Sequence, residues 1–66
     1  MRIRVNGSDK DVDEAIPLLR LLDGLGLKHQ STVVECNGAI LDRSSYDSTV
    51  LAEGDQLELV RFVGGG

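Results

Sequence analysis

The spacing of leucines in residues 17–25 restricts the fold of this chain more than any other feature. Four of them recur at i, i+3, i+4 and i+7, the spacing of one helical face: Leu18, Leu21, Leu22 and Leu25. Two turns are too short for a coiled coil, so we expect this stripe to lie in the core rather than against a partner helix. The sequence thus predicts one amphipathic helix, which can cover one face of a sheet.

Proline and glycine mark the ends of this helix. Pro17 suits the first helical position, where its missing N–H is not needed. Gly24 weakens the last turn by up to about 1 kcal/mol relative to alanine. Gly26 suits a left-handed C-cap, so the helix is expected to end just before it.

Strand patterns precede the helix. Residues 2–5 alternate polar and apolar side chains, as in a strand with one buried face. Asn6 and Gly7 then supply a turn signal, and residues 8–12 can return as a second, shorter strand. The pattern predicts a hairpin but does not fix its register.

A second hairpin follows the helix, after a polar connection at residues 28–31. Residues 32–36 have the composition of a strand, and Asn37 with Gly38 is the strongest hairpin signal in the chain. Residues 39–41 complete this hairpin as a fourth strand.

The last third of the chain is expected to be irregular until its final strand. Residues 42–49 are polar and rich in turn formers, while residues 50–51 can pair briefly. Residues 57–63 are β-branched, aromatic or aliphatic for the most part and contain no glycine or proline, which predicts the final strand.

The order of these elements predicts the fold class. A hairpin, a helix, a hairpin, a short irregular segment and a final strand correspond to an α+β domain of the β-grasp, or ubiquitin-like, type. We expect a mixed sheet of four to five strands, covered on one face by one main helix, with the first and last strands side by side in its centre. The domain would span residues 1–63, with a flexible glycine tail at residues 64–66.

Composition narrows the class of partner. The 41% hydrophobic and 27% charged residues are typical of a globular chain. Eleven acidic residues against seven basic ones give a net charge of −4, and the acids are scattered. This excludes nucleic acid and anionic membranes as favoured partners and indicates a basic surface on a protein. Because Tyr46 and Phe62 are the only aromatic residues, we expect an aliphatic core.

Three features indicate a cytoplasmic protein. Cys36 is the only cysteine, so no internal disulfide can form. No apolar stretch approaches the roughly 18 residues that a membrane span needs. Met1 leads directly into a charged, strand-like segment rather than a signal peptide.

The three terminal glycines suggest a function. Gly64, Gly65 and Gly66 have no Cβ, so they form a thin tail that can thread a narrow channel in an enzyme. The alternative is that they are a frayed end or a linker without function. Glycines alone do not decide between the two.

Several segments together resemble the ThiS family, the sulfur carriers of thiamine biosynthesis. They are Asn37 with Gly38, residues 53–57, residues 21–27, and residues 60–66 with their glycine ending. The resemblance covers nearly the whole chain. Pro17 stands where a helix-capping threonine is usual in the family, and three glycines replace the minimal two.

The resemblance implies a mechanism centred on the Gly66 carboxylate. A ThiF-like adenylyltransferase would use ATP to convert this carboxylate into an acyl adenylate, and a sulfur donor would then displace the nucleotide. The resulting thiocarboxylate would serve a ThiG-like thiazole synthase. The chain itself would bind no cofactor, because it has no phosphate-binding loop. It would be a cosubstrate rather than an enzyme.

The final strand suggests where a partner docks. If Leu57 and Leu59 face the helix, alternation places Glu58, Val60 and Phe62 on the opposite face. Exposed apolar side chains beside the tail form a plausible docking patch. Alternatively, Phe62 fills the end of the core.

Other polar residues give weaker signals. Cys36 is expected to be a buried small hydrophobe rather than a sulfur-handling thiol. His29 has no second ligand at metal spacing, so we expect no metal site. Arg2 and Arg4 are expected to be solvated near acidic neighbours.

Two further functional classes stay open at the level of sequence. One is a related β-grasp protein that serves molybdopterin, tRNA or amino-acid sulfur, or that modifies proteins. The other is a non-covalent ubiquitin-like binding module with an inert tail. The sequence names neither the downstream acceptor nor the sulfur donor, nor any oligomeric state.

Overall fold

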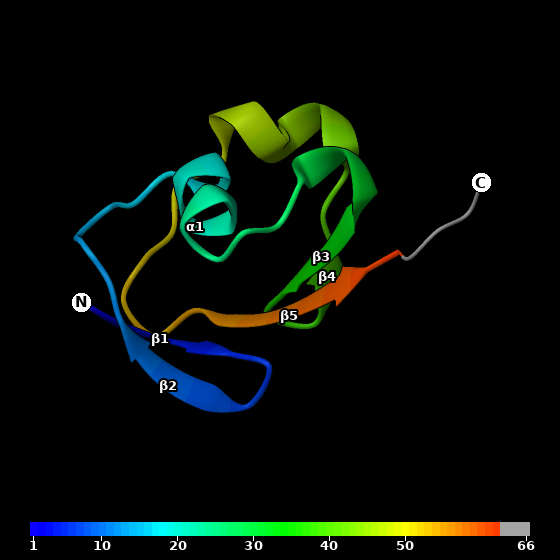
Figure 1. Cartoon of the computed structure of the whole chain (residues 1–66). Coiled ribbons are helices and arrows are strands. Elements are labelled where there is room, and N and C mark those ends of the chain that lie inside the picture. The colour runs from blue at the N-terminus through cyan, green and yellow to red at the C-terminus, as the bar shows by residue number, and fades with distance from the viewer. Residues whose placement is uncertain (63–66) are drawn as a thin grey trace.

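A computed structural model gives the structure of the protein and describes residues 1–62. Residues 1–62 form five strands and one α-helix, with two short 3₁₀ helices in the connections; their arrangement can be followed in Figure 1. In chain order they are β1 (Arg2–Val5), β2 (Ser8–Asp11), α1 (Leu18–Gly24), η1 (His29–Ser31), β3 (Thr32–Cys36), β4 (Ala39–Ile40), η2 (Arg43–Ser48) and β5 (Gln56–Arg61).

The strands form one mixed sheet in the order β2-β1-β5-β3-β4. The first and last strands, β1 and β5, are parallel neighbours, and the other pairs are antiparallel. Helix α1 covers one face of this sheet (Figure 1). This arrangement confirms the predicted β-grasp fold. We call the face of the sheet turned away from α1 the open face.

Both hairpins close with two-residue turns in which both residues have positive φ. The φ values are 48° and 83° at Asn6 and Gly7, and 52° and 87° at Asn37 and Gly38. Positive φ at both positions defines a type I′ turn, whose twist matches that of the flanking strands. The first hairpin therefore has the register Val5 opposite Ser8, which its sequence alone did not fix.

Helix α1 is one residue shorter at each end than the predicted span of 17–25. Pro17 is the N-cap, one position before the expected one, because its ψ of 143° is extended. Gly26 has the predicted left-handed conformation, with φ of 75°. The Gly26 and Leu27 amides donate to the carbonyls of Asp23 and Leu22 at 3.0 and 2.9 Å, which is a Schellman motif.

The predicted leucine stripe lies in the core, and the core is aliphatic as expected except for Tyr46. Tyr46 is only 3% exposed. Its hydroxyl accepts a hydrogen bond from the Val34 amide at 3.1 Å and donates one to the Thr32 carbonyl at 2.9 Å. A tyrosine can be buried here because β3 satisfies its polar end. The core residues are Ile3, Leu18, Leu21, Leu22, Val34, Tyr46, Leu51, Leu57 and Leu59.

The two 3₁₀ helices lie in segments for which the sequence predicts only polar connections and turns. Arg43 joins them, because its guanidinium in η2 donates to the carbonyls of His29 and Gln30 in η1. Val50 forms an isolated bridge with Pro17, which confirms the brief pairing expected near residues 50–51.

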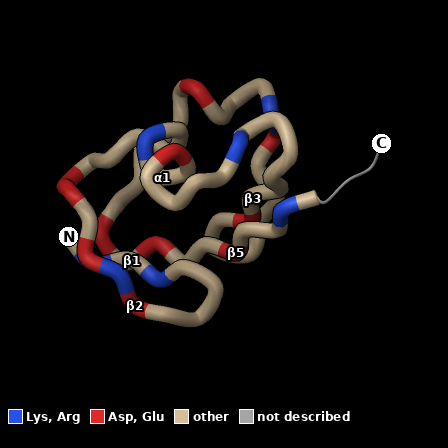
Figure 2. Tube along the Cα trace, in the orientation of Figure 1, with Lys and Arg blue, Asp and Glu red and all other residues tan. Residues whose placement is uncertain are grey.

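Charged residues of both signs are interspersed along the trace (Figure 2). No helix among residues 1–62 is long and apolar enough to cross a membrane.

Candidate functional site

Strand β5 presents two chemically different faces. Leu57 and Leu59 are 1% and 8% exposed and belong to the core under α1. Glu58 is exposed, and Val60 and Phe62 are 56% and 58% exposed. The structure thus confirms the predicted alternation. The alternative in which Phe62 fills the end of the core is wrong.

Neighbouring strands enlarge the apolar part of the open face. Val33 on β3 lies directly opposite Val60. Ile40 on β4 is opposite Glu35, so it shares the open face, and it is 71% exposed. We call the four side chains Val33, Ile40, Val60 and Phe62 the apolar patch. Sequence reasoning missed Val33 and Ile40, although alternation in residues 32–36 and the register set by the Asn37 turn could have found them.

Two carboxylates stand side by side next to the apolar patch. Glu35 on β3 is directly opposite Glu58 on β5, and both line a shallow groove between the two hairpin turns. Like charges at opposed positions of a sheet disfavour each other. Within residues 1–62 neither carboxylate forms an ion pair. A basic group from outside would relieve this repulsion.

The two arginines of β1 are already paired, although Arg4 lines the same groove as Glu35 and Glu58. Arg2 lies 3.0 Å from Asp11, and Arg4 lies 3.2 Å from Asp9. The hydrogen bond from Arg2 lowers the pKa of the Asp11 carboxyl below its ordinary value. All four side chains are solvated, as expected for this basic spot. Glu35 and Glu58 differ from these arginines in having no ion pair among residues 1–62.

The turn asparagines hold β5 in place from both sides. The Asn6 side chain accepts from the Leu59 amide at 2.8 Å and donates to the Leu59 carbonyl at 3.4 Å. On the other side, Asn37 accepts from the Gln56 amide and donates to Asp55, both at 3.0 Å. These contacts fix the strand that leads into the C-terminus.

Cys36 does not resemble a reactive thiol. It is half-buried on β3 and packs against the core. Burial, and after it the Asp55 carboxylate, raises the pKa of the Cys36 thiol above its ordinary value. The thiol form is therefore favoured at neutral pH. No cluster of three potential metal ligands occurs within the described part of the chain, His29 included.

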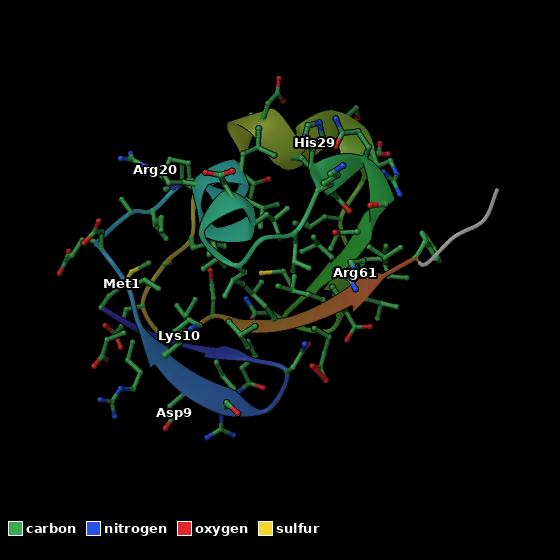
Figure 3. The ribbon with its side chains drawn as sticks, viewed as in Figure 1. Met1, Asp9, Lys10, Arg20, His29 and Arg61 are labelled. Atoms are coloured by element: carbon green, nitrogen blue, oxygen red, sulfur yellow. The ribbon has the colours of Figure 1, made fainter. Side chains whose placement is uncertain are left out.

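Gly64, Gly65 and Gly66 lie outside the described residues. The glycine tail and the modification of Gly66 therefore stay predictions from the sequence. The structure describes the strand that precedes them and the face of the sheet that this strand carries (Figure 3).

Comparison with known proteins assigns the family. The model of the ThiS family matches residues 3–66. The chain belongs to the ThiS family. This membership confirms the resemblance read from the sequence. A crystal structure of the thiamine biosynthesis protein ThiS from Geobacter metallireducens superposes with a TM-score of 0.83, at 36% identity over the whole of both chains.

Two curated relatives of this ThiS-family chain are much longer proteins. All of the chain is 41% identical to part of a thiazole synthase from Magnetococcus marinus and 35% identical to part of one from Paramagnetospirillum magneticum. The chain spans 20% of the length of each. A ThiS-like segment thus occurs within polypeptides that are named thiazole synthases.

Proposed function

We propose that the chain carries sulfur for thiazole formation as a thiocarboxylate on Gly66. Family membership over residues 3–66 is the observation that carries this proposal. The chain acts as a cosubstrate in the cytoplasm and is consumed and regenerated by partner enzymes. Its β-grasp domain presents the tail, and the tail bears the reacting group.

The chemistry requires activation, because a carboxylate is a poor electrophile. The Gly66 carboxylate attacks the α-phosphorus of ATP, and pyrophosphate leaves. The acyl adenylate then reacts with a sulfur nucleophile, which forms a carbon–sulfur bond and releases AMP. No redox change occurs when the nucleophile is sulfide. The product is a thiocarboxylate, which is nucleophilic at sulfur.

Two partners follow from this chemistry. A ThiF-like adenylyltransferase supplies the ATP site and performs the activation. A ThiG-like thiazole synthase takes the sulfur. The occurrence of ThiS-like segments within proteins named thiazole synthases supports the second partnership.

The open face is the proposed docking surface for the adenylyltransferase. Val60 on β5 and Phe62 directly after β5 are exposed, and Glu58 precedes them on the same face. Val33 and Ile40 extend the patch, and Glu35 doubles the acidic charge. A complementary partner surface has an apolar centre with a basic group beside it.

The test is the intact mass of the protein after incubation with ATP, sulfide and the adenylyltransferase. We expect a gain equal to one sulfur in place of one oxygen. Deletion of Gly65 and Gly66 should abolish the gain and leave the thermal stability unchanged. No gain, with an adenylyltransferase that modifies another carrier, would contradict the proposal and favour a non-covalent binding module.

A further inference from the structure

The hydrogen bonds of β5 alternate between its two neighbours. The Phe62 amide donates to the Ser31 carbonyl beyond β3, and the Gln56 carbonyl accepts from Asn37, so even-numbered residues bond toward β3. The Leu57 carbonyl accepts from the Asn6 amide on the β1 side. Odd-numbered residues of β5 therefore direct their N–H and C=O groups toward β1.

Strand β1 ends before β5 does. Its pairing with β5 stops at Val5 opposite Leu57, and the Asn6 side chain then occupies the Leu59 amide and carbonyl. Arg61 is the next odd residue. Within residues 1–62, no group accepts from its N–H or donates to its C=O on this side. Figure 3 shows Arg61 near the end of β5, beyond the turn of the first hairpin.

The two outer strands of the sheet, β2 and β4, are protected against pairing with another chain. The end of β5 that extends beyond β1 is not. Strand β2 carries alternating charges at Asp9, Lys10 and Asp11, and β4 has only two residues. Charged and very short edge strands discourage pairing with another chain. The projecting end of β5 instead has exposed apolar side chains, Val60 and Phe62, on either side of its free backbone groups.

We propose that an extended segment of the adenylyltransferase pairs with β5 at Arg61 and continues the sheet where β1 stops. This inference rests on the proposed function. If Gly66 is the reacting residue, only four residues separate Phe62 from the end of the chain, which span at most about 13 Å. An enzyme that reaches the Gly66 carboxylate must therefore lie close to this edge.

The chemistry of the edge defines the partner segment. It offers backbone N–H and C=O groups to Arg61, as in other cases of strand addition. Its side chains on the open face lie next to Val60 and Phe62, so we expect apolar residues there. The pairing would place the partner segment beside Val60 and Phe62 and hold the last strand in line with the tail.

The test removes one backbone donor and leaves the fold in place. Arg61→Pro deletes the outward N–H, and proline is tolerated where a strand N–H faces solvent. Arg61→Ala is the matched control, because it removes the side chain and keeps the N–H. We expect the proline variant to bind the adenylyltransferase about three- to tenfold more weakly than the alanine variant.

Amide hydrogen exchange supplies the second readout. In the free protein the Arg61 amide should exchange fast and the Leu59 amide slowly, and the adenylyltransferase should protect Arg61. Equal affinities of the two variants, with Arg61 unprotected in a complex that still forms the thiocarboxylate, would overturn the inference and leave the proposed function intact. Protection of Arg61 by the thiazole synthase alone would overturn the choice of partner. Failure of the wild-type chain to gain sulfur would overturn both proposals.

Discussion

The two faces of the segment 56–62, which is β5 and the residue after it, differ in burial. Toward α1, Leu57 and Leu59 are buried among the leucines of the helix. Toward solvent, Glu58, Val60 and Phe62 remain exposed. The buried face stabilises the domain, whereas the exposed apolar residues add less to its stability, since more than half of their surface stays in contact with water.

The buried side chains of this segment therefore serve the stability of the fold, and its exposed side chains serve the recognition of a partner. A domain of 66 residues has a small core, so each buried side chain matters to the fold. Two large apolar residues left in water near the C-terminus are better explained by a partner than by folding. Substitutions on the two faces should therefore have different consequences.

The largest effect is expected from Leu57→Ala. The side chain is 1% exposed, and its truncation should lower the free energy of unfolding by about 2–5 kcal/mol, which is a large part of the stability of so small a domain. Val60→Ala is the matched control on the other face, with an expected change within about 0.5 kcal/mol. Urea denaturation followed by circular dichroism measures both. Equal losses would break the division between the two faces.

Tyr46→Phe should cost about 1–3 kcal/mol, because it leaves the Val34 amide and the Thr32 carbonyl without their buried partner. Ser48→Ala removes an exposed hydrogen bond from the same 3₁₀ helix and should have little effect. Thermal unfolding compares the two variants. An unchanged Tyr46→Phe variant would show that the hydroxyl does not support the buried side of the sheet.

Phe62→Ser should act on binding and spare the fold. We expect the affinity for the adenylyltransferase to fall about tenfold, as for an apolar contact near the centre of an interface. Val50→Ser is the control, since Val50 is 56% exposed, close to the 58% of Phe62, but lies outside the apolar patch. Calorimetric titration gives the two affinities. Similar losses for both variants, or unfolding of the Phe62 variant, would contradict the assignment of this face.

Substitution of the two turn asparagines tests whether each one holds a different part of β5. Asn6→Gly keeps the positive φ of the turn and loses both bonds to Leu59, so we expect about 1 kcal/mol of destabilisation and faster exchange of the Leu59 amide. Asn37→Gly should instead speed exchange of the Gln56 amide. Hydrogen exchange by NMR distinguishes them. Identical exchange patterns would mean that the two turns do not hold separate parts of β5.

The smallest effect concerns Cys36. Because its pKa is raised in the folded state, alkylation by iodoacetamide at neutral pH should be slower than for the unfolded chain in urea. The rate should rise only as the pH passes above the ordinary pKa of a thiol. By linkage, the contribution of this group to stability is present below that pKa and is lost at higher pH. Fast alkylation at neutral pH, or loss of sulfur transfer in Cys36→Ser, would point to a reactive thiol.

Most of the fold follows from the sequence because its signals are local. The leucine period, the two Asn-Gly turns and the alternation in β5 each specify an element without reference to the rest of the chain. The burial of Tyr46 could not be predicted in this way. It depends on backbone groups of β3 that lie 12 to 14 residues away.

The candidate site could be predicted only in part for the same reason. Alternation along β5 was enough to find Glu58, Val60 and Phe62. The contributions of Val33, Glu35 and Ile40 depend on strand register, which sets their neighbours across the sheet. The free groups of Arg61 depend on where β1 ends relative to β5, which no local pattern specifies.

Transfer of labelled sulfur tests the central claim most directly. The chain would be loaded with radiolabelled sulfide in the presence of ATP and the adenylyltransferase, purified, and mixed with the thiazole synthase and its other substrates. We expect label to leave Gly66 and to appear in the thiazole product in equal amounts. Label that remains on the chain while thiazole forms at the same rate without it would contradict the assignment as the sulfur carrier of this pathway.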